Sequence, residues 1–411
     1  MAGNMDRHYL DQAATSWPKS PAVLQAFQDY FVHCGASPGR GAYRSSLDAD
    51  AIVSRARQQV ALLIGADRPS DIFFASNGTQ ALNLAIQGIA LGQVHRAAEG
   101  APIHVVTTAT EHNSVLRALS LAKEHGWLDF TIVPCSSDGG LLPERIEAAI
   151  QDNTQWIVLN HASNVTGAVQ PLSAISAIVR KHRLRWMLDA AQSLGYLPID
   201  VHEAGIDILA APSHKGIGGL VGASVLFVNS EIQQELHPLW AGGTGQASHK
   251  IDGPWQWSEQ VEAGNMNVAA IAALETAIQI HQRQAPDDLH KLAEWSKQLL
   301  DAIADLENLE LVGPSTPELD QRLPVFSLKL SERAPMFGTG ATNCQEWAMI
   351  LEQMASIECR AGFHCAGAIH SCLGTDDQGG TLRLSLGLAS TQENVDAACS
   401  ALPMLDGFLH S

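Results

Sequence analysis

The residues best placed to do chemistry are a lysine and a carboxylate, each of which follows a short apolar run. Lys215 comes soon after the run 207–212 and directly before the glycine-rich stretch 216–219. Asp189 directly follows the run 186–188. A lysine held away from water is a standard nucleophile toward carbonyl groups. A buried carboxylate needs an offsetting partner, either a helix N-terminus or a cationic group on a ligand.

The ends of two further strands carry polar residues that could bind a phosphate and contact a flat ring. Residues 76–79 open a predicted helix, whose free N–H groups and Thr hydroxyl can hold a phosphate, although this pattern alone is more often an N-cap. His112 follows another apolar strand, but in a chain with 17 His a single one is more often structural. Together with Lys215 and Asp189, these groups match the phosphate, ring, aldehyde and pyridine nitrogen of pyridoxal phosphate.

The elements that must position these residues follow a regular alternation over the first two-thirds of the chain. Helices are expected at 79–91, 114–124, 143–150 and 172–182, and strands at 71–75, 104–108, 130–134, 156–159, 186–188, 206–210 and 223–228. Continuous apolar strands spaced by helices predict a mostly parallel sheet covered on both faces, with ligands beyond the carboxyl ends of its strands. The chain has neither a Walker A loop nor a Rossmann glycine fingerprint after its first strand.

The pattern changes after about residue 265. A long helix over 267–284 is followed by a predicted break at 284–288, and then by helix, short strands at 325–330 and 381–386, and a terminal helix from Gln392. We therefore predict an α/β fold with a large, mostly parallel, seven-stranded α/β/α domain and a smaller α+β domain. The large domain is expected over 15–285, and the small domain over 1–14 and 286–411.

The composition and net charge of the chain argue against several classes of function. The 411 residues are 46 % hydrophobic and 17 % charged, which predicts a folded chain. A net charge of −18 argues against binding to nucleic acid or anionic lipid. No apolar run approaches the ~20 residues of a membrane helix, and the first nine residues do not resemble a signal peptide. Seven scattered cysteines do not form a disulfide framework, so we expect a reducing, cytoplasmic location.

Nine segments in a fixed order resemble the class V, fold-type I pyridoxal phosphate enzymes, specifically the cysteine desulfurases of group II (Suf-like and selenocysteine-lyase-like). The segments are Tyr9-Leu-Asp-Gln-Ala-Ala-Thr15, Asn77-Gly-Thr-Gln80, Glu111-His-Asn113, His161-Ala-Ser-Asn-Val-Thr-Gly167, Asp189-Ala-Ala-Gln192, Ser213-His-Lys215, Glu262-Ala-Gly-Asn265, Arg360-Ala-Gly-Phe-His-Cys365 and Thr381-Leu-Arg383. Any one of them is a weak signal, but the ordered set covers nearly the whole chain. The segment 360–365 is the one specific to desulfurases.

The resemblance implies a role for each cofactor-binding residue. Lys215 is expected to bind the cofactor aldehyde covalently and to shuttle the substrate Cα proton. Asp189 would keep the pyridine nitrogen protonated, Gln192 would bond the ring hydroxyl oxygen, and His112 would stack on the ring and act in proton transfer. The phosphate would be held by Gly78, Thr79, Ser213 and His214, and from the partner subunit of a homodimer by Asn265. The family more often has Thr at this last position.

The resemblance also implies how substrate is held and where its sulfur goes. Asn164 and Arg383 would bind the substrate carboxylate, Arg383 through a bidentate charge-assisted pair. Cys365 would accept the sulfur, helped by a nearby cation or by His364, while Phe363 would exclude water. Phe363 stands where the family often has a second His. The expected products are L-alanine and a persulfide on Cys365, for delivery to a sulfur acceptor such as an iron–sulfur scaffold.

Alternatives remain open from sequence alone. The same scaffold serves selenocysteine lyases, cysteine sulfinate desulfinases and other class V aminotransferases or lyases, and the substrate could be L-cysteine or selenocysteine. A non-catalytic scaffold protein is a third reading, against which the intact Lys215, Asp189, Arg383 and Cys365 argue. No metal site is expected, because the Cys spacings around 359–372 are longer than zinc sites usually have. Cys359 is expected to be a packed residue. The role of Cys372 stays open, because an exposed second thiol could receive sulfur.

Overall fold

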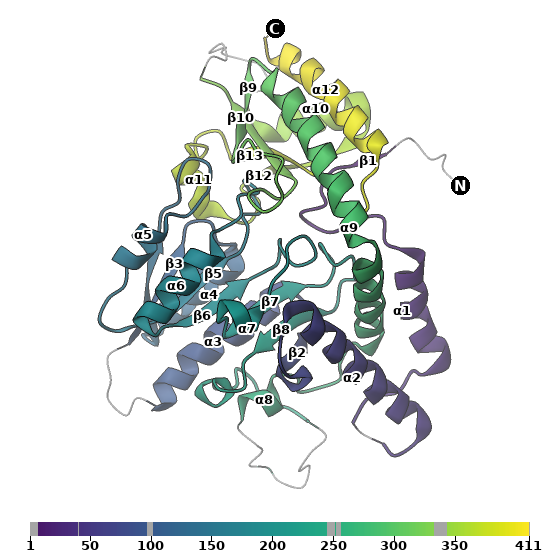
Figure 1. Ribbon diagram of the computed structural model, residues 1–411, viewed down its shortest axis with the longest axis vertical. Helices are drawn as coiled ribbons and strands as arrows, with labels where there is room; N and C mark the ends of the chain where they lie inside the picture. The colour runs from purple at the N-terminus through teal and green to yellow at the C-terminus, as the bar shows by residue number, and fades with distance from the viewer. Residues whose placement is uncertain are drawn as a thin grey trace.

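The computed structural model describes residues 7–39, 41–96, 102–244, 251, 256–332 and 343–410. A seven-stranded sheet with the strand order β2-β8-β7-β6-β5-β3-β4 forms the centre of the larger part (Figure 1). Strands β7, β6, β5, β3 and β4 are parallel, whereas β8 runs antiparallel to both of its neighbours. The bounds are Ile72–Ala75 (β2), Ile103–Thr108 (β3), Leu128–Val133 (β4), Thr154–Asn160 (β5), Arg185–Asp189 (β6), Ile208–Pro212 (β7) and Ser224–Val228 (β8).

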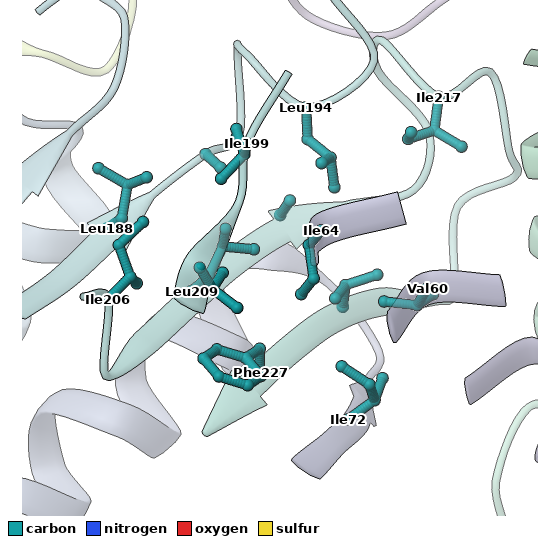
Figure 2. Close-up of a cluster of buried hydrophobic side chains, with 14 of the residues drawn as sticks. Val60, Ile64, Ile72, Leu188, Leu194, Ile199, Ile206, Leu209, Ile217 and Phe227 are labelled. Atoms are coloured by element: carbon teal, nitrogen blue, oxygen red, sulfur yellow. The ribbon is translucent and has the colours of Figure 1, made fainter. Parts of the chain in front are cut away.

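These strands lie inside the fold because both of their faces are apolar. Neighbouring residues along a strand point to opposite faces, so Leu188 packs into one buried cluster and Met187 into the other. Helices α2, α6 and the start of α9 cover the first cluster, part of which Figure 2 shows, and α3 and α4 cover the second. The bounds are Pro21–His33 (α1), Arg44–Ile64 (α2), Gly78–Arg96 (α3), Asn113–Glu124 (α4), Pro143–Ala148 (α5), Leu172–His182 (α6), Val201–Ala204 (α7) and Trp257–Gln260 (α8).

A second sheet, antiparallel throughout, forms the smaller part with the strand order β12-β13-β10-β9. The short strand β1 pairs in parallel with β11, so the beginning of the chain lies beside its last third. Helices α10, α12 and the end of α9 pack around Phe326 and Trp347. The bounds are His8–Tyr9 (β1), Val268–Ala304 (α9), Leu309–Val312 (β9), Val325–Leu330 (β10), Cys344–Ala355 (α10), Ile357–Glu358 (β11), Arg360–Gly362 (β12), Gly367–Leu373 (α11), Thr381–Ser385 (β13) and Gln392–His410 (α12).

The predicted fold class is confirmed. Every strand expected before residue 230 has a counterpart in the large sheet, displaced by no more than two residues. None of the helices in the described ranges combines the length and apolar character that crossing a bilayer requires.

The predicted helix break at 284–288 is wrong. Helix α9 runs without interruption from Val268 to Ala304, with Pro286 inside it. Proline lacks the N–H that would bond to the carbonyl four residues earlier, at a cost of about 3 kcal/mol. The helix continues because it packs on α1 and α2 before the proline and on α12 after it. The predicted boundary between the two domains therefore falls inside a helix, and the division itself stays a prediction.

Candidate active site

A cleft of about 260 Å³ lies beyond the carboxyl ends of the parallel strands. β5 ends at Asn160, β6 ends at Asp189, and Lys215 follows the end of β7. The start of α3 forms another wall, and Arg360, His364 and Arg383 close the cleft from the small sheet. The predicted residues that line it are Gly78, Thr79, His112, Asn164, Asp189, Gln192, His214, Lys215 and Arg383.

Lys215 and Asp189 both line the cleft, and their charges interact. Burial lowers the pKa of the Lys215 ammonium to about 8, although Asp189 favours its charged form. Burial raises the pKa of the Asp189 carboxyl, and a hydrogen bond from Ala191 N to Asp189 Oδ1 (2.9 Å), together with Lys215, opposes the rise. At neutral pH a useful fraction of Lys215 is a free amine, which is the nucleophilic form.

His112 presents a neutral imidazole to the cleft. It caps α4: Nδ1 accepts a hydrogen bond from Ser114 N (3.0 Å) and lies 2.8 Å from Ser114 Oγ. Burial, together with the nearby Lys215 and Arg360, lowers its pKa to about 4. Since Nδ1 is an acceptor, the proton lies on Nε2, and the flat ring is free of charge near neutral pH.

The start of α3 could bind an anion through neutral hydrogen-bond donors. Gly78 and Thr79 line the cleft, and the first N–H groups of a helix lack partners within it. Thr79 Oγ1 lies 2.8 Å from Ser114 Oγ. His214 Nδ1 lies 3.0 Å from Thr15 Oγ1, and burial lowers the pKa of His214 to about 4, so this ring is neutral too.

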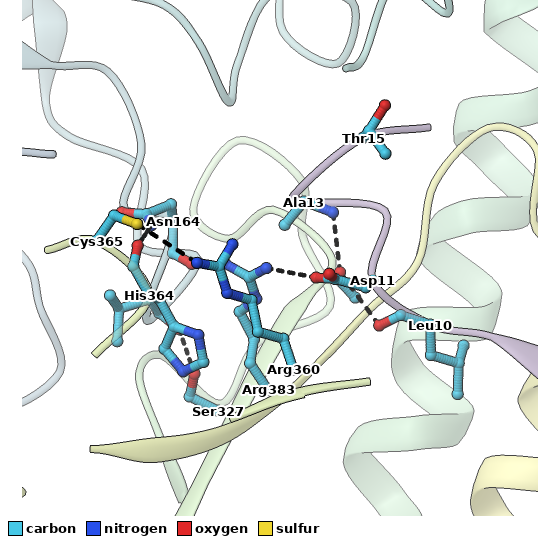
Figure 3. A network of polar contacts seen from close by, with 12 residues as sticks. Leu10, Asp11, Ala13, Thr15, Asn164, Ser327, Arg360, His364, Cys365 and Arg383 are labelled. Carbon is cyan, nitrogen blue, oxygen red and sulfur yellow. Dashed lines mark hydrogen bonds and ion pairs between the residues drawn. The ribbon is translucent and has the colours of Figure 1, made fainter. Parts of the chain in front are cut away.

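Arg383 and Asn164 carry unused hydrogen-bonding groups at the cleft. Arg383 is 1 % exposed; one terminal nitrogen donates to Asn164 O (3.0 Å) and the other to Asp11 Oδ1 (2.5 Å), as Figure 3 shows. Asn164 Nδ2 donates to His364 O (2.7 Å). Arg383 Nε and Asn164 Oδ1 are buried without a partner among the described residues. Such orphaned groups are costly unless a ligand satisfies them.

Cys365 lies in a loop just outside the cleft, with an arginine at its sulfur. The Cys365 side chain is exposed, and Arg360 donates a hydrogen bond to Cys365 Sγ at 3.4 Å (Figure 3). His364 and Cys365 both have positive φ, 49° and 60°, and the loop turns toward α4 of the larger part. There Asn113 N donates to Cys365 O (2.7 Å), beside His112.

Comparisons with known proteins agree with this geometry. The sequence pattern of the aminotransferase class-V family matches residues 8–398. The chain belongs to this family. It is similar to a probable cysteine desulfurase of Methanothermobacter thermautotrophicus, with 30 % identity over 98 % of this chain and 95 % of the relative. It is also similar to the cysteine desulfurase IscS of Proteus mirabilis, with 27 % identity over 95 % and 90 % of the two chains.

Solved structures give the same result for the fold. The apo structure of the cysteine desulfurase from Thermococcus onnurineus aligns with a TM-score of 0.85 and 26 % identity, over 98 % of this chain and 95 % of that one. Enzymes of the class-V aminotransferase family use pyridoxal phosphate. The predicted assignment to group II within the desulfurases stays a prediction.

Two predicted ligands of the class-V cofactor do not line this cleft. The Ser213 hydroxyl donates toward Leu220 O (2.5 Å) and Ala223 O (2.8 Å), inside the turn that follows Lys215. Asn265 lies at a separate small cavity, where Asn265 Oδ1 accepts a hydrogen bond from Ser37 Oγ (3.1 Å). Its predicted role concerns the phosphate of a partner subunit, so a position away from its own cleft fits that role. Both roles stay predictions.

The structure distinguishes between the two groups, a nearby cation and His364, that the sequence offered as help for the Cys365 thiol. His364 Nε2 lies 2.9 Å from Thr381 Oγ1, and burial holds the pKa of His364 well below its usual range, so His364 supplies no charge to the thiol. The charged group at the Cys365 thiol is Arg360, to which the sequence analysis gave no role. The sequence feature that could have identified Arg360 is its position in the segment 360–365, which also contains Cys365. Asp11, which orients Arg383, was missed in the same way.

The remaining cysteines are less suited to catalysis than Cys365. Burial raises the pKa of Cys359 to about 12, and its side chain packs against the small-domain core, as expected for a packed residue. Cys372 is half-buried and packs against the core of the larger part, to which Cys135 also belongs. Among the described residues, no group of three His, Cys, Asp or Glu side chains is arranged to hold a metal ion.

Proposed function

We propose that this protein is a pyridoxal phosphate-dependent cysteine desulfurase that converts L-cysteine to L-alanine and transfers the sulfur to Cys365. The observation that supports it most directly is the Arg360 N–H donated to Cys365 Sγ at 3.4 Å, at the mouth of a cleft that contains Lys215 and Asp189. A transaminase or a simple lyase needs no protein thiol there. The names of the relatives point to the same activity.

The cleft residues fit the cofactor. Asp189 would hold the pyridine nitrogen, Lys215 the aldehyde carbon, His112 one face of the ring, and Gly78 and Thr79 the phosphate. The buried Asp189 carboxylate has only one hydrogen bond from a described residue, so a cationic nitrogen would offset its burial. When bound, pyridoxal phosphate supplies an electron sink that allows the Cα–H and Cβ–S bonds of the substrate to break.

The chain's own residues position the substrate and move its protons. Arg383 Nε and Asn164 Oδ1 are the unused groups at the carboxylate seat, with Asp11 holding the guanidinium in place. Arg383 binds the carboxylate through N–H groups, whereas Asn164 Oδ1 can accept from the substrate ammonium. The Lys215 amine removes the Cα proton, which its lowered pKa permits near neutral pH.

Sulfur transfer balances without an external oxidant. The Cys365 thiolate attacks the sulfur of the substrate; an S–S bond forms and the Cβ–S bond breaks. The electron pair stays with carbon, which takes up a proton and leaves as alanine, and Cys365 keeps a persulfide. Arg360 donates a guanidinium N–H to the sulfur that makes this attack. Because Cys365 is exposed, we propose that a protein acceptor, such as an iron–sulfur scaffold, collects the sulfur.

The location and assembly are part of the same proposal. All seven cysteines are free thiols, which supports a reducing compartment, and we propose the cytoplasm. We also propose a homodimer, in which Asn265 of each subunit contacts the phosphate of the other.

The test is the Cys365→Ala variant in a single turnover. We expect it to bind pyridoxal phosphate and cysteine but to form almost no alanine, a loss of about 100-fold or more. Mass spectrometry of the wild-type peptides should find the added sulfur on the Cys365 peptide. Cys399→Ala, which changes a half-buried thiol on α12, serves as the matched control and should keep full activity. Unimpaired alanine formation in Cys365→Ala would refute the proposal.

A further inference from the structure

A second cavity, of about 280 Å³, shares Lys215 with the active-site cleft. Its walls come from the segment 16–23, from α9 and from residues 388–389. Much of the lining is apolar, including Val23, Ile217, Ala277, Ile280 and Leu388. The desulfurase reaction described above gives this cavity no role.

One cation in this cavity has no counter-charge. Lys19 Nζ donates to Ser16 Oγ (2.6 Å) and to His214 O (2.9 Å), both of which are neutral. No described carboxylate lies within ion-pair distance of Lys19, and burial alone lowers its pKa to about 8. Two hydrogen bonds leave one of the three ammonium donors unused. An ammonium desolvated in this way gains from an anionic partner more than an exposed lysine does.

Among the other polar side chains that line the cavity, Asp288 and His281 do not neutralise Lys19. Asp288 lies 3.7 Å from Lys291, which offsets its charge. His281 Nδ1 is buried with no partner among the described residues, and burial lowers the pKa of His281, so the ring is neutral. Lys215 also lines the cavity, but its charge interacts with Asp189. The cavity thus combines one ammonium without a counter-charge, that of Lys19, with a neutral imidazole and aliphatic walls.

We propose that this cavity binds a small molecule with one carboxylate and a short aliphatic chain, its carboxylate paired with Lys19. A single ammonium matches a monoanion better than a phosphate dianion, which usually has several donors. The aliphatic walls favour an apolar chain over a fully polar anion. The site lies beside the active centre, because the carbonyl that Lys19 bonds belongs to His214, the residue before Lys215. The proposal does not depend on which reaction the cleft performs.

The test is calorimetric titration of the holoenzyme with butyrate, and with butylamine as a probe of equal size and opposite charge. We expect saturable binding of one butyrate per chain in the millimolar range, and none of butylamine. Lys19→Met should weaken butyrate binding at least about tenfold, the loss of one ion pair. Lys297→Met, which removes an exposed ammonium from α9, is the matched control and should bind as wild type does.

Two further variants separate this site from the cleft and from misfolding. Leu388→Trp should fill the cavity and abolish butyrate binding while Lys19 stays in place. Arg383→Ala removes the carboxylate seat of the cleft and should leave butyrate binding unchanged. Absence of saturable binding below about 50 mM butyrate would overturn the proposal. So would binding that survives both Lys19→Met and Leu388→Trp, or binding that is lost in Arg383→Ala, because the carboxylate would then occupy the cleft.

Discussion

Glu111 is a fully buried carboxyl group one residue before His112. Its Oε1 accepts hydrogen bonds from Thr108 Oγ1 (2.6 Å) and Asn160 N (3.0 Å), whereas Oε2 has no partner among the described residues. Burial, with a smaller effect of the nearby Asp189, raises the pKa of Glu111 to about 8 against the effect of the two hydrogen bonds. At neutral pH this side chain is therefore mainly a neutral acid that fixes the end of β5 beside the cleft.

Replacing Glu111 with Gln should raise stability increasingly with pH. In the unfolded chain Glu111 ionises near its ordinary pKa, but in the folded protein only near 8. The wild type therefore loses stability as pH rises from about 4.5 to about 8, with no further loss from this group above that. Gln stays neutral and can still accept at Oε1. We expect the midpoint of thermal unfolding of Glu111→Gln to match wild type near pH 5 and to exceed it by a few degrees at pH 8.5. Equal midpoints at both pH values would contradict the assignment.

Arg360 should control how readily Cys365 reacts. Without the guanidinium N–H at Cys365 Sγ, the thiolate loses its nearest cation. Arg360→Met should therefore slow alkylation of Cys365 by iodoacetamide at pH 7 about tenfold, while Arg360→Lys keeps part of the rate. Peptide mass spectrometry follows the alkylation, with Cys399 in the same sample as the internal control. An unchanged rate in Arg360→Met would show that the hydrogen bond has no effect on reactivity.

At the scale of elements, α9 spans both parts of the molecule through Pro286. The proline is exposed, so replacing it with Ala removes little packing and restores an N–H that can donate to Gln282 O. The regained helix stability, up to about 3 kcal/mol, outweighs the ~1 kcal/mol lost because Ala gives the unfolded chain more freedom. We expect Pro286→Ala to raise the unfolding midpoint by a few degrees in calorimetry. Gln284→Ala, also exposed on α9, should change it by less than a degree. A lower midpoint for Pro286→Ala would mean that the proline relieves strain in this helix.

The sequence predicted the strand ends well because a buried strand can be recognised from its own residues. An apolar run followed by a polar residue is visible without tertiary information, and it located Asp189 and Lys215. The orientation of loop side chains could not be recognised from the local sequence in this way. Whether His364 or Arg360 meets Cys365 depends on the positive φ angles at 364 and 365 and on the hydrogen bond of His364 to Thr381, which comes from another strand. The helix break failed for the same reason, since packing from distant helices outweighed the local cost of a proline.

At the scale of the whole molecule, the active centre joins segments that are far apart in the chain. Asp11, near the beginning, holds Arg383, near the end, and Asn164, from the loop after β5, contacts both Arg383 and the cysteine loop. The two parts of the fold thus meet at the carboxylate seat. A substrate bound there would contact both parts, so binding should couple their relative position to the placement of Cys365.

The face around the connection between α1 and α2 is unusually apolar for a surface. Phe31 and Val32, at the end of α1, are 63 % and 72 % exposed, and Tyr43 and Leu47, at the start of α2, are 57 % and 56 % exposed. The same connection contains Ser37, which bonds to Asn265, the residue predicted to reach the partner's phosphate. Exposed apolar patches of this kind mark protein interfaces, so we expect this face to form the homodimer contact.

Phe31→Glu should therefore convert the protein to a monomer. A charge in place of an aromatic anchor at an interface costs about 2–4 kcal/mol, which weakens association about 30-fold to 1,000-fold. Sedimentation velocity at micromolar concentration should give twice the chain mass of 43.9 kDa for wild type, and a single-chain mass for Phe31→Glu. Met404→Glu is the matched control: Met404 is 57 % exposed on α12, far along the chain from this face, and should leave the dimer intact. Because the proposed contact of Asn265 is with the phosphate of the partner subunit, Phe31→Glu should also bind pyridoxal phosphate more weakly, whereas Met404→Glu should not. A fully active wild-type monomer would exclude the dimer, and an unchanged dimer in Phe31→Glu would place the contact on another face.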